Sequence, residues 1–168
     1  MGATRQFCSF FVDGLCFGIE VARIQEIRDV TAMTRVPLAP REIGGLVNLR
    51  GHIITAIDLR RCLDLSDRPA GERPLNLILR AAGGRVSLLV DRMGDVLDLS
   101  EDDFELPPRT LNVRSRELIR GAYKLDGRLL LVLNLDSIVN GTTGAAERPC
   151  AGWPEPDDAR RLIGQGSV

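Results

Sequence analysis

The chain has 168 residues, of which 44% are hydrophobic and 27% charged, and its 22 Lys and Arg residues nearly balance 23 Asp and Glu residues. This composition is typical of a globular protein with one domain, or with two small halves that share a core. The net charge of −1 and the aromatic content of 4% disfavour a nucleic-acid binder, which needs basic side chains for phosphates or rings for base stacking.

The four cysteines have no close spacing, and the chain has a single histidine, His52. A tetrahedral zinc site needs closely spaced thiolate or imidazole ligands, so we expect no metal and no cofactor. At least three of the cysteines are expected to be small core residues in a reducing cytoplasm. Because no apolar run approaches the roughly 18 residues that cross a bilayer, we expect a cytoplasmic protein with no membrane insertion.

The N-terminal part is typical of a β-hairpin. Residues 6–12 have strand-like order, Asp13 and Gly14 form a turn signal, and residues 15–21 return as the second strand. Residues 34–43 contain two prolines and predict an extended loop.

Residues 46–59 predict a second hairpin, in which Gly51 supplies the positive φ of a tight turn. Its returning strand, IITAI at residues 53–57, has no polar face. Such a strand is expected to be covered on both sides. The polar residues 64–74 then predict a loop.

The second half predicts a strand at residues 74–80 and, at residues 85–99, a second strand with a short helical or irregular segment leading out of it, as near the N-terminus. Ser100, followed by Asp103, resembles a helix N-cap and predicts a single helical turn. The acidic residues between 98 and 105 are expected to be solvated, with a docking surface for a basic partner as the alternative.

The C-terminal part begins with a predicted short helix at residues 114–119. Residues 129–135 predict a strand that is apolar on both faces. From Gly141 onward, Gly, Thr, Ala, Pro and charged residues dominate, so residues 141–168 are expected to form a mostly flexible tail.

Two blocks of this chain are repeated in the same order. Residues 43–60 align without a gap on residues 119–136, and residues 14–27 align on residues 83–96. The chain therefore resembles one small β unit written twice. Many short strands with glycine turns favour two small closed barrels of about five strands, and the two fully apolar strands predict a shared dry core.

No pattern of residues predicts catalysis. His52 is the only imidazole that could act as a general base, and it directly follows a turn. The glycine pairs lack the spacing of a phosphate-binding loop. We therefore predict no catalytic residues, and an enzyme built on a duplicated barrel is the least favoured alternative.

The turn at residues 48–51 (NLRG) differs from its repeat at residues 124–127 (KLDG). Leu and Gly are kept, whereas the polar residues change. Divergence at polar positions on a retained scaffold is what a specialised binding surface would show. A solvated turn residue is the alternative reading of Arg50.

Several motifs resemble the CheW-like family of bacterial chemotaxis coupling proteins. They are RIQEIR at residues 23–28, GLVNLRG at residues 45–51, IDLR at residues 57–60, and VD with DVL at residues 90–97. The resemblance covers residues 6–140 and implies a single all-β domain of two intertwined, five-stranded SH3-like barrels with few short helical turns.

The same resemblance implies limits for the two barrels. The first is expected at about residues 14–66 and the second at about residues 75–140, and the N-terminal strand is a candidate to be shared between them.

The resemblance further implies a non-enzymatic adaptor. It would join the cytoplasmic helical hairpin of a methyl-accepting chemotaxis receptor to the regulatory domain of the CheA histidine kinase, in the cytoplasm at membrane receptor arrays. The family's receptor-facing surface falls on Ile24, Glu26 and Arg50, with Gly45 and Asn48 shaping the turn beneath them. The kinase surface is carried over to no individual residues.

Two other functions stay open from sequence alone. The first is the same adaptor role in a surface-motility or other signalling array. The second is a peptide-binding or nucleic-acid-binding small barrel that is unrelated to signalling.

Overall fold

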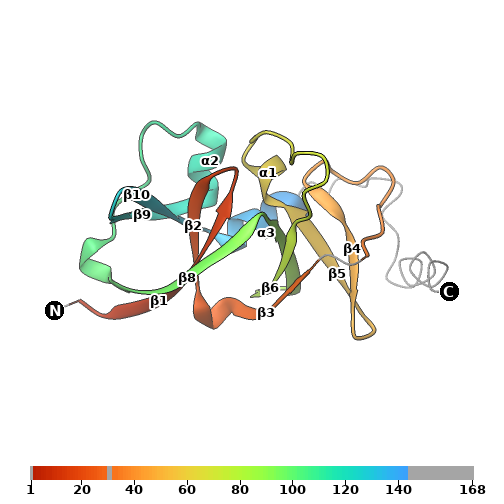
Figure 1. The fold of residues 1–168 in the computed structure, drawn as a ribbon, viewed down its shortest axis with the longest axis horizontal. Coiled ribbons are helices and arrows are strands. Elements are labelled where there is room, and N and C mark those ends of the chain that lie inside the picture. Colours follow the sequence, from red (N-terminus) through yellow and green to blue (C-terminus); the bar gives the residue numbers. More distant parts are fainter. Residues whose placement is uncertain (1, 30–31, 144–168) are drawn as a thin grey trace.

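The computed structural model describes residues 2–29 and 32–143. Within them, ten strands form two five-stranded sheets (Figure 1). The first sheet has the order β8-β1-β2-β10-β9, with β1 Thr4–Val12, β2 Leu15–Glu20, β8 Arg92–Ser100, β9 Ile119–Leu125 and β10 Arg128–Leu133. The second has the order β3-β6-β7-β5-β4, with β3 Ile24–Asp29, β4 Ile43–Leu49, β5 His52–Asp58, β6 Leu75–Ala81 and β7 Gly84–Val90.

The helices are short and lie between strands. They are η1 Val21–Arg23, α1 Leu59–Cys62, η2 Glu101–Asp103, α2 Val113–Leu118 and α3 Leu135–Thr143. The predicted helical turn after Ser100 is confirmed as η2. The Ser100 side chain accepts a hydrogen bond from the Asp102 backbone N–H. The predicted helix at 114–119 is confirmed as α2, which Asn112 caps.

The internal repeat organises both sheets. The first copy contains β1 to β5 and the second contains β6 to β10, and each sheet takes two strands from one copy and three from the other. The parallel pairing of Phe17 with Leu131 in the first sheet matches that of Val86 with Thr55 in the second, at aligned positions. The predicted intertwined fold is confirmed.

This strand exchange corrects the expected barrel limits of 14–66 and 75–140. The chain crosses to the second sheet after β2 and crosses back after β7, so the second sheet is the continuous stretch from β3 to β7, whereas the first combines β1 and β2 with β8, β9 and β10. Sequence similarity shows where each copy lies along the chain. Which strands pair in a sheet depends instead on how their apolar faces are buried.

The domain also extends past the expected limit at residue 140. Helix α3 continues to Thr143, and Thr142 is buried, with its hydroxyl donating a hydrogen bond to the Ile138 carbonyl at 2.7 Å. Gly141 therefore belongs to the folded domain. The expected flexibility of the tail beyond Thr143 concerns residues outside the described part.

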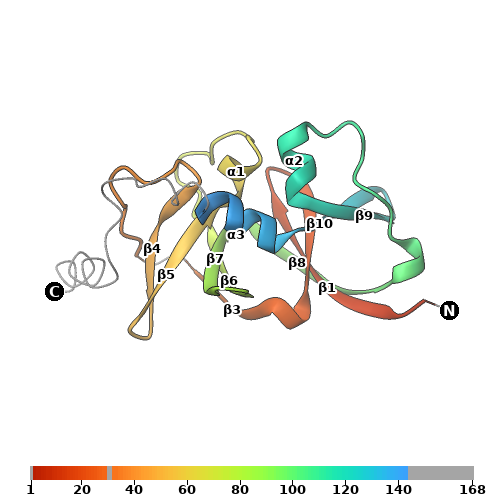
Figure 2. The ribbon, with the colours of Figure 1, turned by 180° about the vertical axis from the view of Figure 1, so that it is seen from behind.

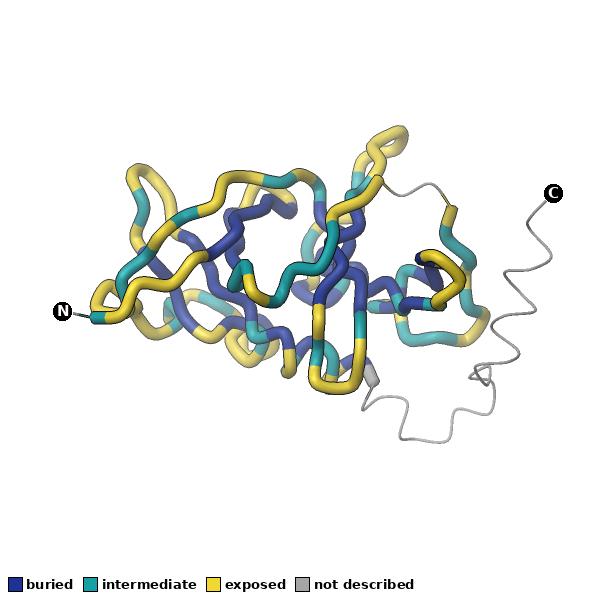
Figure 3. The backbone as a smooth tube through the Cα atoms, turned by 90° about the horizontal axis from the view of Figure 1, so that it is seen from below, coloured by how far each residue is buried: buried dark blue, intermediate teal, exposed yellow. Residues whose placement is uncertain are grey.

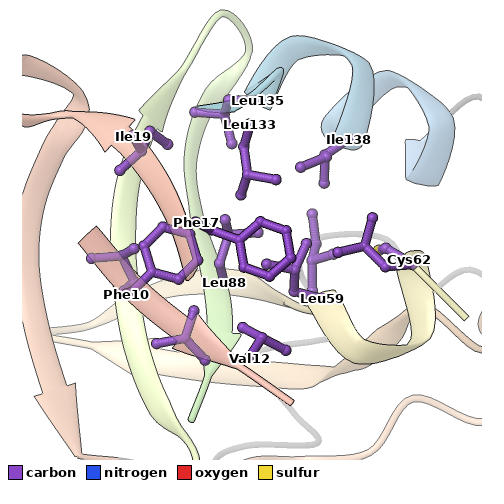
Figure 4. Packing of buried hydrophobic residues seen from close by; sticks show 14 of the residues in the cluster. Phe10, Val12, Phe17, Ile19, Leu59, Cys62, Leu88, Leu133, Leu135 and Ile138 are labelled. Atoms are coloured by element: carbon purple, nitrogen blue, oxygen red, sulfur yellow. The ribbon is translucent and has the colours of Figure 1, made fainter. Parts of the chain in front are cut away.

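The two sheets share one apolar core, as the sequence predicted. Phe10 and Phe17 of the first sheet stack with ring centroids 5.9 Å apart and belong to the same cluster as Leu77 and Leu88 of the second (Figure 4). Helices α1 and α3 close this core, and α3 lies where the sheets meet (Figure 2). Exposed residues concentrate in the loops and turns (Figure 3).

The two strands predicted to be covered on both sides are largely buried. In β5, Ile54, Ala56 and Ile57 are buried, and the β10 residues 130–133 are buried as well. The exception is Leu129, which is 42% exposed at the start of β10. Residues from both faces of these strands therefore contribute to separate apolar clusters.

Three cysteines are small core residues, as expected. Cys8, Cys16 and Cys62 are buried and free, and Cys150 lies outside the described residues. Burial raises the pKa of the Cys62 thiol to about 12. This thiol is therefore protonated at neutral pH and unreactive.

A buried ion network lies where the chain crosses between sheets after β7. Asp91 accepts hydrogen bonds from Arg60 Nε at 3.1 Å, from Arg68 Nη2 at 3.0 Å and from the Asp13 backbone N–H at 2.8 Å. The Arg60 side chain is only 6% exposed. Because Asp13 lies in the β1–β2 turn and Arg60 in α1, the network ties the two sheets together.

Burial alone would raise the pKa of Asp91. The hydrogen bonds from Arg60, Asp13 and Arg68 outweigh burial, and they hold this pKa below its ordinary value. A lowered native pKa stabilises the fold above the unfolded pKa of about 3.9, and the stabilisation is lost as the pH falls through the native value.

We predict that Asp91→Asn lowers the free energy of unfolding at pH 7 by about 2 to 4 kcal/mol, because it leaves the buried Arg60 guanidinium with only the more distant Asp13 carboxylate, at 3.5 Å. Urea denaturation measures this loss. The difference in unfolding free energy between wild type and variant should narrow as the pH falls below the unfolded pKa of about 3.9 and through the lowered native pKa of Asp91. Exposed Asp98→Asn on β8 is the control, and equal midpoints for both variants at pH 7 would contradict the prediction.

Candidate partner-binding site

The turn between β4 and β5 presents Arg50 to solvent. Arg50 and Gly51 have φ angles of 50° and 84°, which is the backbone twist that favours two-residue hairpins. Asn48 Oδ1 accepts a hydrogen bond from the Gly51 N–H at 2.9 Å and so closes the turn. The predicted positive φ of Gly51 is confirmed, and the Arg50 side chain is 71% exposed.

Glu26 and Arg50 bring the two edges of the second sheet together. Glu26 lies on edge strand β3, whereas Arg50 follows edge strand β4. Their side chains meet at 3.3 Å, between Arg50 Nη2 and Glu26 Oε1, so the sheet is curled until its edges approach. The exposed guanidinium limits the contribution of this pair to about 0 to 1 kcal/mol. Its main effect is to fix the position of Arg50.

Gly45 allows a close crossing of two backbone segments. Its φ is 154°, and an added Cβ would lie 2.6 Å from both Met33 Cγ and the Thr34 carbonyl oxygen. Thr34 and Leu46 exchange two backbone hydrogen bonds of 2.9 and 2.8 Å beside it. Glycine is therefore required where the Thr34 segment lies along the outer edge of β4.

Ile24 is less available than the sequence suggested. It is the first residue of β3, it is half-buried, and it packs against the shared core. A register shift between Ile24 and Glu26 separates it from the ion pair. The structure thus brings Glu26, Asn48 and Arg50 into one site and places Ile24 at its margin.

A groove of about 620 Å³ opens between β3 and β4. It is lined by Glu26, Ile27, Arg28, Asp29, Ala32, Met33, Thr34, Leu46, Val47, Asn48, Leu49, Asn76 and Ile78. The buried Leu49 and Ile78 form its apolar floor together with Ile54. The floor residues of β6 were not predicted, because they come from a strand far along the chain; the polar Asn76 within the apolar run LNLIL was their one signal.

The equivalent position in the first sheet is narrowed by aromatic side chains. The Phe104 ring lies 5.3 Å from the ring of Tyr123, which lies 5.5 Å from that of Phe7. By the repeat, Tyr123 takes the place of Val47 and Phe7 that of Asn76. These three rings line a pocket of about 250 Å³, so the hollow in the second sheet is the larger of the two.

The ion pair is also restricted to one end. In the repeat, Asp126 takes the place of Arg50, and Asp95 that of Glu26. Two carboxylates cannot form such a pair. The groove and the ion pair together mark the second sheet as the specialised surface.

The described residues offer no alternative chemical centre. Within 2–29 and 32–143, no group of three or more His, Cys, Asp or Glu side chains is placed to hold a metal ion. His52 is exposed and pairs across the hairpin with Leu49. In the same part of the chain, no helix has the length and apolarity needed to span a membrane.

Comparison with solved structures supports the architecture. The crystal structure of the scaffolding protein TtCheW from Thermoanaerobacter tengcongensis superposes with a TM-score of 0.72. The sequences are 24% identical, and the match covers 82% of this chain and 92% of TtCheW. The two proteins therefore share a fold.

Sequence comparisons identify the family. The CheW-like domain model matches residues 6–142. Chemotaxis protein CheW of Rhizobium meliloti is 28% identical over 134 residues, covering 80% of this chain and 86% of that protein. Chemotaxis protein CheW of Thermotoga maritima is 28% identical over 135 residues, covering 80% and 87%. This chain therefore belongs to the CheW-like domain family.

Proposed function

We propose that this protein is a non-enzymatic adaptor that couples a methyl-accepting chemotaxis receptor to the CheA histidine kinase. The observation that carries the proposal is the Glu26–Arg50 pair beside a groove of about 620 Å³, because the equivalent place in the first sheet has a smaller pocket and two carboxylates in place of the pair. The protein would act in the cytoplasm and be recruited to membrane receptor arrays through these partners.

The groove suits the cytoplasmic helical hairpin of a receptor. Its apolar floor and the 45% exposed Ile27 offer area to apolar side chains of a helix. The charges at its rim, on Glu26, Arg28 and Arg50, would orient the helix and reject unsuitable partners more than they would add affinity.

The regulatory domain of the kinase would bind a different surface. The shared core holds the two sheets in a fixed relation, so a partner on the first sheet and a partner in the groove can be held at a constant distance. Two modest interfaces become strong together when receptor and kinase are already concentrated in one array.

We predict that Arg50→Glu weakens binding to a receptor cytoplasmic fragment at least about tenfold, because it reverses the rim charge and repels Glu26. The unfolding free energy should change by no more than about 1 kcal/mol, since the pair is exposed. Pull-down and calorimetry with the fragment measure binding. The exposed loop residue Arg73→Glu is the charge-matched control, and wild-type receptor affinity in Arg50→Glu would remove the assignment of this surface.

A second prediction concerns Ile24. Ile24→Asp should abolish receptor pull-down and also lower the unfolding free energy by about 1 to 2 kcal/mol, because the side chain packs partly on the core. Receptor binding is measured at the same folded fraction, which circular dichroism reports, and kinase binding should persist. The matched control is Leu15→Asp, at a 42% exposed position on β2. Full receptor binding by folded Ile24→Asp would exclude Ile24 from the site.

A further inference from the structure

The groove contains one buried polar side chain that neither the ion pair nor the fold explains. On β6, Leu77 and Leu79 face the shared core. Asn76 and Ile78 alternate with them and face the groove, which both of them line. Asn76 is only 2% exposed.

The amide of Asn76 is fixed on one side only. Ser87 Oγ, itself fully buried on β7, donates a hydrogen bond to Asn76 Oδ1 at 2.7 Å. The Nδ2 group carries two hydrogens that the bond with Ser87 does not use, and it is not a buried nitrogen without a partner. Ser87 thus holds the carbonyl side of the amide and leaves its donor side toward the groove.

The internal repeat shows that this position does not require a polar residue. Asn76 pairs with Leu89 across β6 and β7, in the same register in which Phe7 pairs with Glu20 across β1 and β2. The fold therefore accepts a buried phenyl ring at the equivalent place. Burying an amide instead is unfavourable unless its hydrogen bonds are made.

We infer that Asn76 is a specificity-determining residue at the floor of the groove, where its Nδ2 donates to the side-chain carboxamide of a Gln or Asn of the partner. The inference rests on the proposed function, because the partner is taken to be a helical hairpin. Backbone carbonyls within a helix already accept one hydrogen bond each and lie behind the side chains, so a side-chain acceptor reaches the groove floor more readily.

The charges around the groove favour a neutral acceptor over a carboxylate. Glu26 and Asp29 both line it, and they would repel an incoming carboxylate. Among the described lining residues the one cation is Arg28, whose side chain is 48% exposed and pairs with Glu26 at 3.3 Å. A carboxylate would therefore be buried over Leu49 and Ile78 without a counter-charge.

The test is a double-mutant cycle between this chain and a soluble cytoplasmic hairpin fragment of a receptor from the same organism. On this chain, Asn76→Leu is combined with Ser87→Ala, so that both hydrogen-bonding groups are removed together and no buried hydroxyl is left unpaired. On the fragment, each Gln and Asn near the tip is changed to Ala. Affinities are measured by calorimetry, and folding by urea denaturation; if the double variant fails to fold, Asn76→Ala replaces it.

We expect the change at Asn76 to weaken fragment binding about tenfold and to leave kinase binding unchanged. Removal of one carboxamide of the fragment should weaken binding to the wild type but not to the variant. A purely structural role of Asn76 would not produce this dependence of affinity on a single partner residue. Ser9→Ala, a buried serine of the first sheet, is the control and should bind like wild type.

Two outcomes overturn the inference and separate it from the proposed function. If the Asn76 variant binds the fragment with wild-type affinity while Arg50→Glu does not, the groove binds the receptor but Asn76 does not contribute to its specificity. If the variant is weaker but couples to no carboxamide, its role is structural. Wild-type binding in both the Asn76 and Arg50 variants would instead reject the proposed function.

Discussion

The shared apolar core is the constraint on which the rest of this structure depends. Each sheet takes its strands from both copies of the repeat, and the first sheet is complete only after the chain has crossed between the sheets twice. The crossing brings Phe10 and Phe17 of one sheet against Leu77 and Leu88 of the other in a single cluster. Because protein cores pack densely and deform little, the two ends of the molecule hold a fixed relative position. An adaptor needs that rigidity if a partner at one end is to influence a partner at the other.

The ion network at Asp91 complements this core with directional contacts. Apolar packing alone tolerates small rotations of one sheet against the other. The Asp91 carboxylate restricts such rotations, because it accepts hydrogen bonds from Arg60 in α1, from Arg68 in the following loop and from Asp13 in the β1–β2 turn. The Arg60 of the IDLR motif therefore has a structural role, although it lies in the same sequence block as the exposed Arg50. Both arginines belong to family motifs, so the motifs do not distinguish their roles. Burial does, because Arg60 is buried and Arg50 is exposed.

Sequence reasoning reached the fold class because the repeat and the glycine turns are local features. The turns at Gly14 and Gly51, the capped turn after Ser100 and helix α2 all follow from residues close in sequence. The repeat alone does not predict the exchange of strands between sheets, since two aligned copies are compatible with separate or with intertwined barrels, and the intertwined arrangement came from the family resemblance. The meeting of Glu26 with Arg50 was anticipated from family motifs, but the floor of the groove depends on β6, and Ile24 is drawn toward the core by a register shift that no pattern of residue types displays.

Duplication explains how one end of the molecule can contain a groove without loss of the fold. In the first sheet, Phe7, Tyr123 and Phe104 narrow to about 250 Å³ the space that Asn76, Val47 and Met33 leave at about 620 Å³ in the second. A hollowed barrel forfeits packing contacts and carries a buried amide, both of which destabilise it. The more tightly packed first sheet and the common core offset this cost, because both sheets share one apolar cluster. The two halves thus have a similar backbone but different surfaces, and polar residues that break the repeat lie at the groove proposed above to bind a partner.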